Sequence, residues 1–333
     1  MPSLPTVAEL AVIPPPVLLL LALALEPIFG EARGPFARLP HPVRAIGALV
    51  GALEKRLNRL ERSAADRRMR GVLVVVLVCT LSAGCGAAVS AFARGIPFGW
   101  VVELALVVSL LAQRSLFRHV CRVGQALTSD GLEAGRAQVA HIVGRDVRQL
   151  DKHGVARAAI ESCAENFSDA VVAPVFWYLL LGLPGMLAYK AINTMDSMIG
   201  YRSERYRAFG WAAARLDDAA NLLPARLAGL FVAAAAIGVP GASPIEGVRT
   251  MLRDAGKHRS PNAGWPEAAM AGVLGLSLSG PRRYPGLVVD DPWIGDGTAQ
   301  AEARDVRRAL AVFAGACVLN GCVVAAVAIA RVG

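Results

Sequence analysis

The sequence predicts an all-α integral membrane protein with about four to six membrane-embedded helical segments, including a re-entrant hairpin, plus cytoplasmic helices. Residues 71–93 and 309–330 carry no formal charge. An α-helix rises about 1.5 Å per residue, so about 20 residues cross the roughly 30 Å apolar core of a bilayer. The composition agrees, since 55% of the residues are hydrophobic and 18% are charged, fewer charged residues than in most soluble domains. Both stretches are therefore expected to span the membrane.

The first half of the chain contains two further apolar segments. Residues 12–29 are expected to form a retained span and not a signal peptide, because no Lys or Arg precedes them and no clean cleavage site follows. Residues 98–112 are apolar except for Glu103 and follow the 71–93 segment after a short loop, which predicts a transmembrane hairpin. The polar stretch 113–168 is long enough for several helices, and we predict that it is a cytoplasmic helical insertion.

The second half contains an apolar segment with a turn signal in its middle. Residues 171–189 could form one span, but Gly-Leu-Pro-Gly at 182–185 is a strong turn signal. A re-entrant hairpin would keep the polar groups before and after this segment together, and broken helices are tolerated where they line a cavity in the protein. We therefore predict the hairpin.

A further candidate span covers residues 222–240. If it crosses fully, the basic segment 249–259 lies outside, against the positive-inside rule. The segment could instead re-enter, or return through the apolar stretch 268–280, and the sequence leaves this open. We expect a polar loop region at 249–305, within a single polytopic membrane domain that covers residues 1–333.

The net charge of +9 does not indicate nucleic-acid binding, because the basic residues are not gathered on one helix with interleaved aromatic residues. They lie beside apolar segments instead: ten Lys and Arg occur in residues 31–70, whereas the loop 94–97 contains only Arg94. The positive-inside rule then places 31–70 and the segment after residue 113 in the cytoplasm, with the amino terminus outside.

Three carboxylates recur every fourth residue at 161–169. On a helix, Glu161, Glu165 and Asp169 share a broad face, and Ser162 and Asn166 form an adjacent polar stripe. Like charges at this spacing repel mildly, and a divalent cation or a polyvalent cationic partner would turn that cost into a gain. The alternative is a solvated acidic face, which the apolar continuation of the segment makes less favourable.

A second polar pattern follows the predicted hairpin. Lys190, Asn193 and Ser197 fall at i, i+3 and i+7, with Asp196 beside them. Ionisable groups next to apolar helices usually point into a functional cavity. A Lys can hold phosphate oxygens and an Asp can hold Mg²⁺, whereas the alternative is a structural pair between Lys190 and Asp196.

Two smaller patterns complete the polar set. Asp217 and Asp218 are consecutive and Asn221 follows them, so the pair could coordinate a metal or cap the next helix. Residues 253–267 contain Ser-Pro-Asn and Gly-Trp-Pro turns with basic groups, which suit phosphate or carboxylate recognition. The candidate ligand-binding residues of this segment are Arg253, Lys257, His258 and Asn262. Two further candidates, His41 and Arg44, stand beside the membrane further upstream. No Walker A, G-x-G-x-x-G, G-x-S-x-G or H-E-x-x-H motif occurs, so any use of ATP differs from a P-loop mechanism.

Six segments together resemble the cobinamide-phosphate synthases, also called cobalamin biosynthesis membrane amide ligases. They occur in the order of that family and cover nearly the whole chain: HPVRAIG (41–47), RDVRQLD (145–151), ESCAENFSDAVVAPVFW (161–177), GLPGMLAYKAINTMDSMIGYR (182–202), FGWAAARLDDAANLLPAR (209–226) and RDAGKHRSPNAGWPEAAMAG (253–272). The chain departs from the family near the first apolar segment, where Glu26 and Glu31 stand at about the places of an Asp and of a Gly-Asp-Pro.

The resemblance implies an ATP-dependent amide ligase of cobalamin (vitamin B12) biosynthesis. Such an enzyme joins (R)-1-aminopropan-2-ol, or its O-phosphate, to the propionate carboxylate of adenosylcobyric acid and gives adenosylcobinamide or its phosphate. The implied cofactors are ATP and Mg²⁺. The implied partners are the two substrates, membrane lipid and other cobalamin-biosynthesis enzymes, with no nucleic acid. The implied location is the cell (inner) membrane, as a multi-pass protein whose active site faces the cytoplasm.

The resemblance also suggests roles for the polar residues. Six carboxylates are expected to hold metal or ATP and to take part in catalysis together with Lys190: Glu161, Glu165, Asp169, Asp196, Asp217 and Asp218. Four of these are the candidates for metal ligands: Glu165, Asp169, Asp217 and Asp218. Groups for phosphate or the substrate carboxylate are Lys190, Arg202, Arg253, Lys257 and His258. Groups for the amide-rich corrin periphery are Asn166, Asn193, Ser197, Asn221 and Asn262.

Two other functions remain as alternatives. One is a non-catalytic membrane regulator or corrinoid carrier on the same scaffold, against which the retained acidic residues argue. The other is a secondary transporter, in which buried carboxylates would serve as ion sites. The sequence shows no paired repeat of broken helices, which argues against the transporter.

Overall fold

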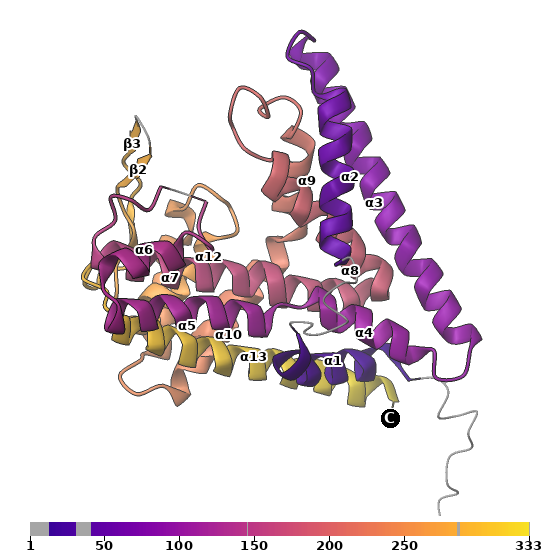
Figure 1. The fold of residues 1–333 in the computed structure, drawn as a ribbon. Coiled ribbons are helices and arrows are strands. Elements are labelled where there is room, and N and C mark those ends of the chain that lie inside the picture. The colour runs from indigo at the N-terminus through magenta and orange to yellow at the C-terminus, as the bar shows by residue number, and fades with distance from the viewer. Residues whose placement is uncertain (1–12, 31–40, 145, 285–286, 333) are drawn as a thin grey trace, which may run out of the picture. The chain divides into compact units, whose positions relative to one another are not determined.

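The structure, a computed structural model, describes residues 13–30, 41–144, 146–284 and 287–332. Helices make up most of these residues, as the sequence predicts (Figure 1). The chain forms two compact units, each built from separate stretches of sequence. Of the described residues, the first unit contains those up to 112, 173–220 and 323–332, and the second contains those within 113–172 and 221–322.

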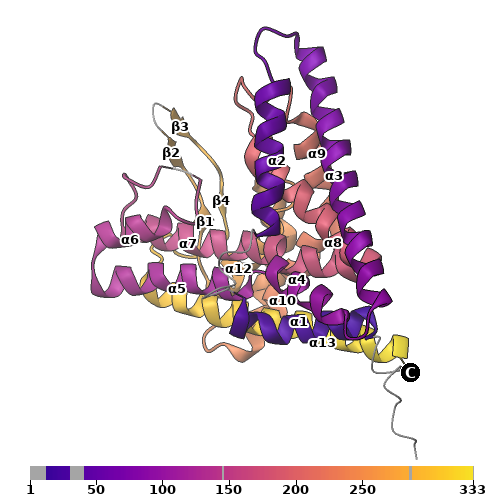
Figure 2. The ribbon, with the colours of Figure 1, turned by 45° about the vertical axis from the view of Figure 1, so that its right-hand side comes forward.

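The helices of the first unit are α1 (Pro15–Phe29), α2 (Pro42–Leu57), α3 (Ala64–Gly95), α4 (Trp100–Leu110), α8 (Ala173–Ile199), α9 (Trp211–Ala220) and the end of α13 (Ala303–Val332). Those of the second unit are α5 (Gln113–Ser129), α6 (Leu132–Val139), α7 (Lys152–Phe167), α10 (Leu222–Ala235), α11 (Pro244–Asp254), α12 (Gly264–Leu274) and most of α13. Four short strands also belong to the second unit: β1 (Leu278–Ser279), β2 (Arg282–Tyr284), β3 (Leu287–Val289) and β4 (Trp293–Ile294). Antiparallel pairs join β1 to β4 and β2 to β3 (Figure 2).

Among the described residues, four helical stretches are long and apolar enough to cross a membrane: Ala64–Gly95, Trp100–Ser129, Lys152–Ile199 and Ala303–Arg331. A fifth would be the broken pair α9 and α10, if its two helices make one span. These numbers fall within the range of segments that the sequence predicts. The predicted hairpin of 71–93 and 98–112 corresponds to α3 and α4, which pack against each other.

The predicted span at 12–29 is shorter than expected. Its helix, α1, has 15 residues and begins after Pro14. At 1.5 Å per residue it measures about 22 Å, short of the roughly 30 Å apolar core. The helix therefore covers only part of the apolar segment 12–29 and is too short to cross the apolar core by itself. Glu26 and Glu31 are the two residues at which the sequence departs from the family pattern. Glu26 is fully buried in α1, and Glu31 lies outside the described residues.

Helix α8 folds back on itself at the predicted turn. Gly182 breaks it with φ +66° and ψ −157°, a conformation that disfavours any residue with a Cβ. Ala173 and Tyr189 then pack in one cluster, although sixteen residues of straight helix would separate them by about 24 Å. The hairpin predicted for this segment is thus present as a chain reversal at Gly182.

The second half of α8 packs along α3. A side chain on Gly86 of α3 would come within 2.7 Å of the Pro184 backbone, so the two helices touch there without one. Further along, Val74 and Val78 of α3 share a buried cluster with Met195 of α8. This packing holds in place the half of α8 that carries Lys190 and Asp196.

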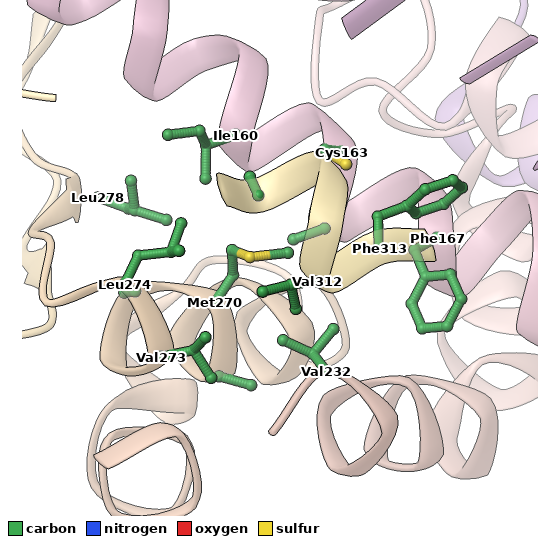
Figure 3. Close-up of a cluster of buried hydrophobic side chains, with 14 of the residues drawn as sticks. Ile160, Cys163, Phe167, Val232, Met270, Val273, Leu274, Leu278, Val312 and Phe313 are labelled. Carbon is green, nitrogen blue, oxygen red and sulfur yellow. The ribbon is translucent and has the colours of Figure 1, made fainter. Parts of the chain in front are cut away.

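The second unit has its own core. Helices α7, α10, α12 and α13 meet in a cluster of buried apolar side chains (Figure 3). Phe167 and Phe313 contact each other edge to face with their ring centroids 5.6 Å apart, a geometry that aromatic pairs favour. The apolar stretches 222–240 and 268–280 contribute α10 and α12, helices of 14 and 11 residues, so each is too short to cross alone.

Candidate functional site

The structure divides the predicted site residues between the two units. The first unit holds His41, Arg44, Lys190, Asn193, Asp196, Ser197, Arg202, Asp217 and Asp218. The second holds Glu161, Glu165, Asn166, Asp169, Asn221, Arg253, Lys257, His258 and Asn262. Within each unit, some of these residues contact one another and others lie apart.

A buried aspartate organises the basic segment of the second unit. Asp254 is the last residue of α11, and its side chain is fully buried. The Arg253 guanidinium donates to both of its oxygens at 2.8 Å, and Lys257 Nζ lies 2.8 Å from Oδ1. The backbone amide of Gly295 donates to Oδ2 at 2.8 Å, and Arg253 also pairs with Asp296. One carboxylate therefore fixes two cations that each remain about 41% exposed.

The electrostatics of this cluster keep Asp254 ionised. The hydrogen bonds from Arg253 first, and then those from Lys257 and the Gly295 amide, hold the pKa of Asp254 well below its ordinary value, although burial opposes this. The same contacts raise the pKa of Arg253. Two basic donors, held in place with part of their surface open, form an arrangement that suits binding of a phosphate or a carboxylate.

His258 lies in the loop after this cluster. Its Nδ1 accepts a hydrogen bond from the Ser260 amide at 3.0 Å, and its Nε2 lies 3.7 Å from Oε1 of the buried Glu267. Accepting at Nδ1 places the proton of a neutral ring on Nε2, facing Glu267. Asn262, which is also buried, follows in the same loop, where Ser260 Oγ accepts its backbone amide at 3.2 Å.

The acidic segment of α7 is tied to this loop by the small β1–β4 sheet. Glu161 is 5% exposed and accepts the Ser279 amide at 2.8 Å. Ser279 pairs with Trp293 of β4, whose carbonyl accepts from Lys257 Nζ at 3.4 Å. This chain of contacts joins Glu161 to the Asp254 cluster within one unit.

The three carboxylates of this segment differ in their surroundings. Glu161 is buried, Glu165 is exposed, and Asp169 lies in a π-helical turn, Ser168–Val172, that follows α7. A π-turn changes the helical register, and such turns are frequent at functional sites. The polar stripe beside them has structural partners, because Asn166 donates to the Ser162 carbonyl and Ser162 donates to the Ile142 carbonyl.

In the first unit, two carboxylates lie together. Asp196 of α8 and Asp218 of α9 are close enough for their negative charges to repel each other. Two arginines moderate this repulsion: Arg215 lies 3.9 Å from Asp218, and Arg202 is near enough to attract it. Two like charges held in proximity suit a divalent cation.

The capping alternative for Asp217 and Asp218 is wrong. Both residues lie in the last turn of α9, and the N-cap of α10 is Asn221, whose side chain makes no capping hydrogen bond. Carboxylates at the end of a helix gain nothing from its dipole. A role outside helix capping therefore gains weight for this pair.

Three basic groups gather at the start of α2. The His41 side chain caps this helix by accepting the Val43 amide at 3.3 Å. Desolvation lowers the pKa of His41, and the nearby charges of Lys190 and Arg44 lower it further. Lys190 is buried on α8, and its positive charge acts on His41. Asn193 and Ser197 follow on α8, with Ser197 exposed.

Comparison with known proteins decides the family. The model of the family described as CobD/Cbib protein matches residues 19–313. The chain is 51% identical to a cobalamin biosynthesis protein CobD of a Sinorhizobium species, over 94% of this chain and 98% of that protein. It is 47% identical to the protein of the same name in Rhizobium meliloti, over 90% and 93% of the two chains, and 46% identical to that of Rhodobacter capsulatus, over 89% and 92%. The chain belongs to the CobD/Cbib family, the family of the cobinamide-phosphate synthases. No solved structure matches it.

Several residues of this CobD/Cbib protein that organise the clusters were not among the predicted site residues. They are Asp254, Glu267, Ser279, Asp291, which lies 2.7 Å from Arg259, and Asp296. Asp254 and Glu267 stand inside a segment that the sequence already singles out for its charges. The others lie within or beside the short strands at 278–294, where the sequence offers no motif.

The donor set of this family member fits Mg²⁺ held through few protein ligands. Among the described residues, no group of three or more His, Cys, Asp or Glu side chains could hold a metal by itself. Mg²⁺ typically takes one or two carboxylates and completes its shell with water and substrate phosphates. Asp196 and Asp218, whose charges act on each other, offer two such carboxylates.

Proposed function

We propose that this CobD/Cbib protein is an ATP-dependent amide ligase. It joins (R)-1-aminopropan-2-ol, or its O-phosphate, to the propionate carboxylate of adenosylcobyric acid. The observation that carries the proposal is the Asp254 cluster, which fixes Arg253 and Lys257 as partly open cations. A ligase of this kind must bind three anionic groups, namely the corrinoid carboxylate, the ATP phosphates and the phosphate that is released.

The reaction needs activation because a carboxylate does not react with an amine. In our proposal a carboxylate oxygen of the corrinoid attacks the γ-phosphorus of ATP, the bond to the bridging oxygen breaks, and ADP leaves. The substrate ammonium gives one proton to a carboxylate, and the free amine attacks the acyl carbon. Inorganic phosphate leaves, and the second amine proton passes to solvent.

The protein's contribution to these steps is electrostatic and positional. Arg253 and Lys257 are our candidates for the phosphoryl oxygens, because Asp254 fixes both without removing their charge. Glu165, the exposed carboxylate of α7, is our candidate for the acceptor of the ammonium proton. Asn166 and Asn262 could donate to the amide-rich edge of the corrin.

Within the first unit, Asp196 and Asp218 are our candidates for holding Mg²⁺. Mg²⁺ would supply positive charge to the β- and γ-phosphates when bound. The positive-inside distribution of Lys and Arg supports an inner-membrane protein whose site faces the cytoplasm, where ATP is available.

The test is a product assay in nanodiscs with adenosylcobyric acid, either amine, Mg²⁺ and ATP, in which the corrinoids are resolved by mass. We expect an amidated product that requires ATP and disappears in Asp218→Asn and Glu165→Gln. The matched control is Glu133→Gln, which removes an exposed carboxylate on α6. A well-folded wild type that binds the corrinoid but never forms the amide would identify a regulator or carrier instead.

A further inference from the structure

The first unit contains a cavity that the proposed ligase reaction does not use. Its volume is about 400 Å³, within the usual size of a small-molecule site. Four elements line it: the start of α1, the end of α3, the start of α4 and the break of α8 at Gly182. It therefore sits at the turn of the α8 hairpin, at the opposite end of that hairpin from Asp196.

Most of the wall is apolar, contributed by residues such as Leu18, Ala87, Leu181 and Leu183. The surface next to it is apolar as well, since Phe92, Phe98 and Val101 are exposed around the α3–α4 loop. Helix α3 is long and apolar enough to cross a membrane. An apolar wall that continues into such a surface suits a hydrocarbon chain.

Several polar side chains interrupt this wall. Trp100 Nε1 is buried in it and has no hydrogen-bond partner among the described residues. Glu103, one turn further along α4, accepts the hydroxyl of Tyr178 at 2.8 Å, and Tyr178 is 1% exposed. Arg94, at the end of α3, adds a positive charge. A buried indole N–H without a partner is costly, so this donor is suited to an acceptor supplied from outside.

The lining therefore presents one cation with a donor, one anion, and a hydrocarbon wall. We propose that the cavity binds a phospholipid whose headgroup carries both a phosphate and a primary ammonium. The phosphate accepts from Trp100 Nε1 and pairs with Arg94. The ammonium donates to Glu103, and an acyl chain lies along the apolar wall.

This headgroup matches the charges better than other lipid headgroups. An anionic lipid without an amine leaves the Glu103 carboxylate with the Tyr178 hydroxyl but without a counter-charge in an apolar wall, which is unfavourable. A quaternary ammonium carries the charge but no N–H to donate. The inference concerns a site apart from the proposed ligase residues, so each can fail without the other.

The experiment is native mass spectrometry of the full chain released from nanodiscs that contain equal amounts of three phospholipids: phosphatidylethanolamine, phosphatidylcholine and phosphatidylglycerol. We expect wild type to retain phosphatidylethanolamine several-fold over the other two. Trp100→Phe and Glu103→Gln should each lower that preference about tenfold, the effect of losing one strong hydrogen bond. Trp211→Phe and Glu133→Gln, which change an exposed Trp and an exposed Glu elsewhere, should leave it unchanged.

Three results would overturn the proposal. Equal retention of the three lipids by wild type would mean that the cavity holds acyl chains without reading the headgroup. A preference for phosphatidylglycerol would mean that Glu103 does not act as the anion of the site. A phosphatidylethanolamine preference that survives in both Trp100→Phe and Glu103→Gln would place it elsewhere. The wild-type ranking needs no variant, so it decides even if a variant fails to fold.

Discussion

The Asp254 cluster of the second unit and the Asp196–Asp218 pair of the first solve opposite electrostatic problems. Asp254 is fully buried, and two cations and an amide surround it. Asp196 and Asp218 bring two like charges together. A satisfied cluster stabilises the fold and positions its donors, whereas a repelling pair costs stability until a cation binds. The first feature is therefore expected to support folding and the second to support ligand binding.

The largest effect on stability is expected from Asp254→Asn. The change leaves Arg253 and Lys257 without their buried counter-charge, and removing one partner of a buried pair typically costs about 3 kcal/mol. Unfolding followed by denaturant or heat in detergent measures the loss. The control is Glu246→Gln, which breaks an exposed pair with Arg249 and should change the unfolding free energy by less than about 0.5 kcal/mol. Equal losses in the two variants would contradict a special role for Asp254.

The pair in the first unit should behave in the opposite way. Asp218→Asn is expected to lower amide formation about 100-fold, as expected when a group that stabilises developing charge is removed. It should leave the unfolding temperature unchanged or raise it, because the repulsion with Asp196 disappears. The added stabilisation by Mg²⁺ with ATP should shrink in the same variant. A fall in both activity and stability would show that Asp218 belongs to the scaffold instead.

The turn at Gly182 tests how firmly Asp196 is positioned. Ala is strained at φ +66° and ψ −157°, so Gly182→Ala should destabilise by about 2 kcal/mol and weaken ATP binding through the second half of α8. Gly84→Ala is the matched control, because a side chain there meets nothing within 4 Å and Ala favours a helix. If Gly84→Ala costs as much as Gly182→Ala, the hairpin turn is not the cause.

The smallest expected effect is the pH dependence of the Asp254 cluster. Because the pKa of Asp254 is lowered in the folded protein, its contribution to stability is complete above the unfolded value of about 4 and is lost as the pH falls below it. Wild type should therefore lose more stability between pH 5 and pH 3 than Asp254→Asn does. Parallel pH profiles for the two proteins would contradict the assignment.

The sequence predicted best what depends on local pattern. The uncharged runs at 71–93 and 309–330 correspond to α3 and α13, and the Gly-Leu-Pro-Gly signal correctly marked the reversal at Gly182. For the stretch 12–29 the sequence predicted a longer helix than the structure has. Apolar composition limits how long a span can be, but it does not fix where the helix starts, and here the helix begins only after Pro14.

The organisation of the candidate site could not be predicted in the same way. Asp254 meets Gly295 forty-one residues away, and Glu161 meets Ser279 across 118 residues. Every residue except proline has a backbone amide, so residue type does not show which amides donate to these carboxylates. The side-chain types of 253–262 indicated anion binding, but their fixed arrangement arises from the fold. Likewise, the interaction of Asp196 with Asp218 depends on how α9 packs against α8.

The most direct test of the proposed reaction follows oxygen from the corrinoid carboxylate. Adenosylcobyric acid labelled with ¹⁸O in its propionate is incubated with enzyme, ATP, Mg²⁺ and aminopropanol phosphate, and the products are resolved by mass. An acyl-phosphate ligase transfers one labelled oxygen to inorganic phosphate for every amide formed, and it does so only when ATP and amine are both present. Label in AMP would replace this route by adenylation. Neither amide nor transferred label from well-folded protein would contradict the ligase itself.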